Sequence, residues 1–112
     1  MAYNEAVAQR VRNTLTQYPD VTEKKMFGGL AFLLRGNMCC GIMGDDLMVR
    51  VGFPGYNEAL SHPHVRKMDF TGKPLKGFVY VGPAGVASDS DLKAWVAKAA
   101  EFALSLPAKQ QE

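Results

Sequence analysis

The chain has 112 residues, of which 47% are hydrophobic and 21% are charged, and its formal net charge is +2. This length suits one domain with a modest core, and the composition is typical of a globular protein. The isoelectric point near 8.6 is too mild to predict a dedicated DNA-binding domain, which is usually more basic.

We expect the chain to lack an export signal and a membrane span. The first ten residues contain no apolar run, and the longest apolar stretch covers only residues 30–34, whereas a membrane helix needs about 20 residues. Cys39 and Cys40 are the only cysteines, and as neighbours they cannot easily bridge each other. Unpaired cysteines are typical of a reducing compartment, so we expect a cytoplasmic protein.

Both ends of the chain predict helices. Asn4 is a suitable N-cap for a first helix that ends at Pro19, and apolar residues recur at helical spacing between them. The second helix is expected over residues 88–106, where Ser88 and Asp91 resemble a capping box and the apolar residues form one face.

The residues between the helices predict strands joined by tight turns. Four strands are expected at residues 22–27, 30–35, 38–43 and 47–51. Gly36 and Asn37 fit a two-residue hairpin loop, which would place Phe32 opposite Gly41. That register would lay an aromatic ring over the backbone that a glycine leaves bare.

A less regular segment follows the four strands. Residues 53–55 are expected to end the meander, residues 56–61 to form a short helical turn, and residues 62–70 to be irregular or a weak strand. A further strand is expected at residues 76–81.

Strands are thus grouped in the middle of the chain and helices lie at its ends. This order predicts the α+β class, with an antiparallel sheet of five or six strands flanked by an N-terminal and a C-terminal helix. We expect one domain over residues 1–106 and a flexible tail over residues 107–112.

Several short motifs occur along the chain in a recognisable order. They are Lys24-Lys25-Met26-Phe27-Gly28-Gly29, Gly36, Leu47-x-Val49-Arg50-Val51, Gly72-Lys73-Pro74, Phe78-x-Tyr80-Val81 and Leu92-x-x-Trp95-Val96. In order and spacing, over about residues 5–104, the chain resembles the N-terminal domain of the TfoX/Sxy competence regulators. Each motif alone is weak, but together they are fairly specific.

This resemblance implies a compact α+β fold similar to secretion-chaperone-like domains, and a role around natural competence or transcription regulation. Full-length regulators of the family carry a second, C-terminal domain, and this chain ends where that domain would begin. We therefore expect an N-terminal domain that stands alone. The family has no assigned catalytic residues to carry over, so we expect a non-enzymatic protein without a cofactor.

Two pairs of residues have both a chemical and a structural interpretation. Gly28 and Gly29 could cradle a phosphate, but they lie between strands and match no phosphate-binding motif, so a bend in the sheet is favoured. Cys39 and Cys40 could form a redox sensor. One should face the core and be inert, while the other could be exposed, and a structural role is favoured.

The two histidines, His62 and His64, suggest a metal site. Two ligands are too few for a closed zinc site, so Asp69 or Glu58 would have to complete it, and nothing in their spacing indicates that they do. A solvated loop is therefore favoured, and we expect no metal.

Basic residues raise the alternative of direct nucleic-acid binding. Four of them lie close together in the sequence, at Arg66, Lys67, Lys73 and Lys76. Phosphate binding would require such charges on one surface, and a solvated face is favoured instead. Arg50 lies between two valines, so it points away from them; it could pair with Asp45, Asp46 or Glu23, or hold a ligand carboxylate or phosphate, and pairing is favoured.

Methionines offer a third alternative, because five of them fall in the sheet region. They are Met26, Met38, Met43, Met48 and Met68. Two helices cannot obviously cover both faces of such a sheet, and an uncovered face rich in methionine suits a protein interface.

We therefore expect a regulatory protein-interaction domain that binds a protein partner or a second copy of itself. The alternatives are a nucleic-acid binder with a basic face and a small-ligand-binding protein with a pocket near Arg50 and the Gly28-Gly29 turn. No catalytic, cofactor or metal residue is assigned. The candidate interaction surface consists of Lys24, Lys25, Gly28, Gly29, Met43, Met48, Arg50 and Lys73.

Overall fold

The computed structural model describes residues 3–26, 28–70 and 73–107, with all their side chains except those of residues 26, 70 and 73–75. The elements in chain order are α1 (Glu5–Leu15), β1 (Val21–Met26), β2 (Gly29–Leu34), β3 (Asn37–Met43), β4 (Asp46–Arg50), α2 (Gly52–Leu60), β5 (Val65–Phe70), β6 (Lys73–Val81), the short 3-10 helix η1 (Pro83–Val86) and α3 (Asp89–Leu104). The six strands form one antiparallel sheet in the order β1-β2-β3-β4-β6-β5. The predicted α+β class is confirmed. Within the described ranges, none of the helices has the length and apolar character needed to cross a membrane.

The two predicted helix starts are confirmed. The Asn4 side-chain oxygen accepts hydrogen bonds from the backbone N–H groups of Ala6 and Val7, at 2.9 and 3.2 Å. The Ser88 hydroxyl accepts one from the backbone N–H of Asp91 at 3.2 Å. Each side chain satisfies N–H groups that the first turn of a helix leaves without a partner.

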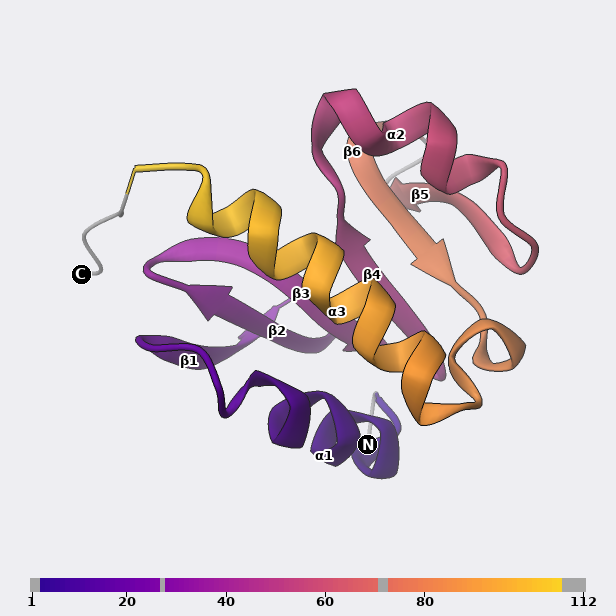
Figure 1. The fold of residues 1–112 in the computed structure, drawn as a ribbon. Coiled ribbons are helices and arrows are strands. Elements are labelled where there is room, and N and C mark those ends of the chain that lie inside the picture. Colours follow the sequence, from indigo (N-terminus) through magenta and orange to yellow (C-terminus); the bar gives the residue numbers. More distant parts are fainter. Residues whose placement is uncertain (1–2, 27, 71–72, 108–112) are drawn as a thin grey trace.

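All three α-helices pack on one face of the sheet (Figure 1). Alternate residues of the strands, such as Phe32 and Val49, form one buried cluster with Val96 of α3 and Ala59 of α2. Helix α1 is held on the same face by an ion pair at 2.5 Å between its Arg12 and Glu23 of β1. Glu23 pairs with Phe32 across the strands, so the two side chains lie on the same face. In the described chain, the opposite face of the sheet therefore has no helix over it.

The β2–β3 hairpin differs from its prediction by one residue. Leu34 pairs with Asn37, so the loop consists of Arg35 and Gly36, not of Gly36 and Asn37. Both loop residues have positive φ, at 55° and 84°. Two positive φ angles in succession characterise the hairpin turn whose twist matches that of the strands. The prediction missed it because arginine rarely adopts this conformation.

A β-bulge then shifts the register of these two strands. Phe32 pairs with Cys40 and Ala31 pairs with Gly41, so the predicted pairing of Phe32 with Gly41 is wrong. The bulge inserts Cys39 as an extra residue, which breaks the strict alternation of side chains. As a result both cysteines lie in the core, at 1% and 0% exposure, and the expectation that one could be exposed is also wrong.

The connector after β4 is more regular than predicted. Helix α2 begins at Gly52, several residues before the expected turn, since a proline such as Pro54 is tolerated in the first turn of a helix. The segment expected to be irregular or a weak strand contains β5, which pairs with β6 at the sheet edge. The predicted flexible tail falls largely on residues 108–112, which lie outside the described residues.

Candidate functional site

A row of four paired residues crosses the centre of the sheet face that has no helix over it in the described chain. Ala31, Gly41, Met48 and Tyr80 pair across strands β2, β3, β4 and β6. Ala31 and Met48 are only 2% and 1% exposed although no helix of the described chain covers them. Space for Met48 comes from Gly41, where an added Cβ would lie 3.1 Å from the methionine methyl carbon.

A bridge of polar contacts covers part of this row. The Tyr80 hydroxyl donates a hydrogen bond to the Met43 sulfur at 3.4 Å, and the Arg66 guanidinium lies 4.8 Å from the centre of the Tyr80 ring. Arg66 also pairs with Asp46 at 2.5 Å, which raises the pKa of the guanidinium. Burial raises the pKa of the Tyr80 hydroxyl, so it stays protonated and able to donate. These contacts link β5, β6, β4 and β3 across the face.

The methionines therefore do not form a bare apolar patch. Met48 and Met68 are 1% exposed, Met38 and Met43 are half-buried, and the side chain of Met26 lies outside the described residues. What this face presents to its surroundings is a set of half-buried apolar side chains beside the buried Ala31 and Met48. They are Leu33, Met38, Met43, Phe78 and Tyr80.

A cavity of about 420 Å³ opens at the end of β4, where the chain turns into α2. It is lined by Arg50, Gly52, Phe53, Pro54, Lys76, Gly77, Phe78 and Phe102. The Arg50 guanidinium lies 5.5 Å from the ring centre of Phe78 and 5.3 Å from that of Phe102. One of its nitrogens donates to the Met38 carbonyl at 3.3 Å. On the rim, Phe53 is 75% exposed, and it is the large apolar side chain that stands out from the described surface.

The predicted ion pair of Arg50 does not form among the described residues. The three carboxylates considered for it have other partners. Asp45 contacts Asn4, Asp46 contacts Arg66, and Glu23 contacts Arg12. Arg50 is thus a half-buried cation held by two aromatic rings and a backbone carbonyl.

The glycine pair has a structural role. Gly28 adopts φ +75° in the turn between β1 and β2. A Cβ at Gly29 would lie 2.2 Å from the Ile42 carbonyl oxygen, so glycine is needed for the close approach of β2 and β3. The strand register places this turn beside the β3–β4 turn, at the opposite end of the strands from Arg50. The two parts of the predicted ligand site therefore do not come together.

The histidines and cysteines form no common site. His62 contacts the Glu58 carboxylate at 2.6 Å and Trp95 edge-on, with ring centres 5.2 Å apart, and this hydrogen bond lowers the pKa of Glu58. His64 is exposed. Among the residues with described side chains, no three of the types His, Cys, Asp and Glu are grouped so that they could hold a metal ion.

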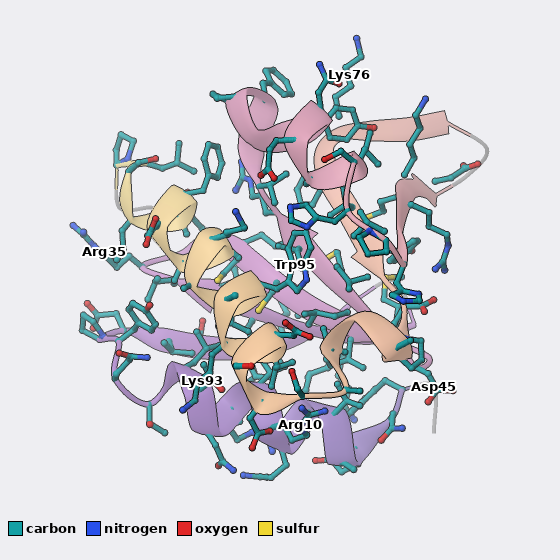
Figure 2. All side chains as sticks on the ribbon, turned by 45° about the vertical axis from the view of Figure 1, so that its right-hand side comes forward. Arg10, Arg35, Asp45, Lys76, Lys93 and Trp95 are labelled. Carbon is teal, nitrogen blue, oxygen red and sulfur yellow. The ribbon has the colours of Figure 1, made fainter. Side chains whose placement is uncertain are left out.

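The clustered basic residues of the sequence are dispersed in space. Arg66 pairs with Tyr80 and Lys67 with Val79, so these two neighbours project to opposite faces of β5. Lys76 lies beside α2 (Figure 2), and the side chain of Lys73 lies outside the described residues. The remaining candidates, Lys24 and Lys25, are exposed on the edge strand β1, where lysines discourage pairing with another sheet.

These features define an α+β domain whose sheet, in the described chain, is covered by helices on one face and uncovered on the other. An aromatic-lined cavity lies where β4 turns into α2. The chain belongs to the TfoX N-terminal domain family, whose model matches residues 13–103. The resemblance found in the sequence motifs is therefore confirmed. No curated protein and no solved structure matches the chain.

Two aromatic residues that line the cavity, Phe53 and Phe102, could not be identified as site residues from the sequence. In the sequence Phe53 marks the end of the meander, and Phe102 belongs to the apolar face of the last helix. No motif marks either residue, because they meet Arg50 only through the fold. The usable signal was the single charge between two valines at Arg50.

Proposed function

We propose that this chain is a non-enzymatic, cytoplasmic regulatory domain that acts through protein–protein contact, in the setting of competence and transcription regulation that the TfoX family name indicates. The observation that carries the proposal is the arrangement of all three α-helices on one sheet face, which leaves the other face uncovered in the described chain. An antiparallel sheet tolerates one solvated face, but such a face usually alternates to polar residues. Here its central row is Ala31, Gly41, Met48 and Tyr80.

We assign a second copy of the chain as the occupant of this face. The molecule measures 33 × 29 × 28 Å along its principal axes, so one face presents roughly 800 Å², about the area per partner in a standard stable interface. Two sheets can pack face to face at about 10 Å, and the small residues Ala31 and Gly41 in the central row permit that approach. The cations Lys24 and Arg66 lie at the two ends of the central row, on the rim, where water screens them.

The solution mass tests this proposal. Light scattering after size exclusion should give twice the chain mass of 12.2 kDa. Leu33→Asp, on the uncovered face, should give the monomer, because the interface would have to bury an unpaired charge. Ala94→Asp introduces the same charge at an exposed position of α3 and should remain dimeric.

The same measurement is repeated with added duplex DNA at low and at high salt. The proposal predicts that the elution volume of the chain is unchanged at both salt concentrations. A monomer that shifts onto DNA only at low salt would overturn it in favour of nucleic-acid binding, since phosphate contacts weaken steeply with salt.

A further inference from the structure

The cavity at the end of β4 combines a cation with apolar walls. Phe53, Phe78 and Phe102 contribute rings, and Gly52 and Gly77 leave room between them. Its volume of about 420 Å³ falls within the range of small-molecule sites, which are mostly apolar with few polar groups.

Arg50 is positioned to bind an anion in this cavity. The rings of Phe78 and Phe102 lie within 5.5 Å of its guanidinium carbon, so the aromatic contacts hold the group in place. A guanidinium has five N–H donors, and the described structure uses one of its nitrogens, on the Met38 carbonyl at 3.3 Å. In the described part of the chain no carboxylate contacts Arg50, although a charge in apolar surroundings is stabilised by a counter-ion.

A second cation reinforces this preference. Lys76 lines the same cavity, and none of the described residues that line it carries a carboxylate. The neighbouring hollow of about 310 Å³ shares Phe102 but is lined by Glu58 and Glu101 as well as Lys98. The charge balance therefore selects the Arg50 cavity, and not its neighbour, for a negatively charged ligand.

We infer that this cavity binds a carboxylate attached to a compact apolar group. The carboxylate accepts hydrogen bonds from Arg50, a geometry that a planar guanidinium suits, and Lys76 adds attraction from the rim. The apolar group packs between Phe53 and the other two rings. This chemistry is shared by small aryl or aliphatic acids and by a peptide whose last residue is aromatic and carries a free C-terminal carboxylate.

Titration calorimetry with a matched set of probes tests the inference. 3-Phenylpropionate should bind. Its neutral amide lacks the charge, and acetate lacks the apolar group, so each should bind at least about 10-fold more weakly. A factor of this size is what a charge-assisted hydrogen bond supplies. The tripeptide Gly-Gly-Phe, with a free or an amidated C-terminus, distinguishes the source. Tighter binding of the free-acid peptide assigns a chain terminus, and tighter binding of 3-phenylpropionate assigns a small acid.

Variants and amide chemical shifts locate the site. Arg50→Gln should weaken 3-phenylpropionate binding by about 10-fold or more, and Lys76→Gln, at an exposed position, by a smaller factor. Arg35→Gln removes the same charge at an exposed hairpin loop and should bind like the unmodified chain. The NMR shifts should centre on Gly52, Phe53 and Gly77.

Three results would overturn the inference. They are no binding of either 3-phenylpropionate or free-acid Gly-Gly-Phe, equal binding of an acid and its amide, and shifts centred elsewhere, such as on Arg10 and Lys93 in the groove between α1 and α3. An unchanged melting curve for Lys76→Gln shows that its effect is on binding and not on folding. Because the oligomeric state is measured separately, failure here leaves the proposed dimer untouched.

Discussion

Replacing Gly52 by alanine should destabilise the fold far more than an ordinary glycine substitution. Gly52 has φ +78°, and a Cβ there would lie 2.2 Å from a ring carbon of Phe102. The left-handed backbone costs an L-residue roughly 1–2 kcal/mol, and forcing an extra carbon against a packed ring costs about 1–3 kcal/mol. We expect a total loss of about 2–5 kcal/mol from a domain whose unfolding free energy is of the order of 5–15 kcal/mol.

Gly44 provides the matched control. Its φ is +62°, but a Cβ there would have no atom within 4 Å. Gly44→Ala should therefore lose only the backbone cost of roughly 1–2 kcal/mol. Urea unfolding followed by circular dichroism measures both losses, and the slope of the transition should stay unchanged.

A double variant isolates the clash itself. In a Phe102→Ala background, Gly52→Ala should cost no more than Gly44→Ala, because the ring is gone. Equal losses of stability for the two glycine variants in the unmodified chain would contradict this prediction. So would a Gly52→Ala cost that persists without the ring, since either result means that Phe102 does not pack against Gly52.

Three further predictions follow from local contacts. The buried Asn37 side chain donates to the Pro107 carbonyl at 2.9 Å, so Asn37→Ala should lose about 1 kcal/mol and speed proteolysis after α3, whereas unchanged cleavage would contradict this tether. The hydrogen bond from Arg12 lowers the pKa of Glu23. The stability that this pair gives the fold is therefore complete above the ordinary glutamate pKa of about 4.3, and it is lost as the pH falls through the lower pKa that Glu23 has in the folded chain. Glu23→Gln should therefore show a smaller drop in melting temperature on acidification, and an equal drop would contradict the pairing. A hydrogen bond between the adjacent thiols, together with burial, raises the pKa of Cys40, so a thiol reagent should label neither cysteine until denaturant is added, and rapid labelling of the native chain would contradict their burial.

The outline of the fold could be predicted from the sequence because its signals are local. Helix caps at Asn4 and Ser88 and the grouping of short apolar segments each depend on neighbouring residues. The hairpin register could not be predicted, since Arg35 adopts a positive φ without any sequence signal, and the bulge at Cys39 changes the alternation that the prediction assumed. The early start of helix α2 could not be predicted, because Pro54 resembles a break in the sequence although it is tolerated in the first turn of a helix.

The candidate site was predictable only in part. Arg50 could be singled out because a charge between two valines on a strand points away from the core. Its partners come from the start of α2, from β6 and from the end of α3, and only folding brings these distant residues together. The burial of Met48 also depends on a tertiary detail, the space that Gly41 leaves on the neighbouring strand.

The most direct test of the proposed interface is an isotope-filtered NMR measurement on a mixture of labelled and unlabelled chains. It detects contacts between protons of different molecules. If two copies pack through the uncovered face, we expect intermolecular contacts that join the methyl groups of Leu33, Met38 and Met43. Intermolecular contacts confined to the helices would contradict the proposed interface. It would also be contradicted by the absence of intermolecular contacts at concentrations where the cross-strand contacts within one chain are strong.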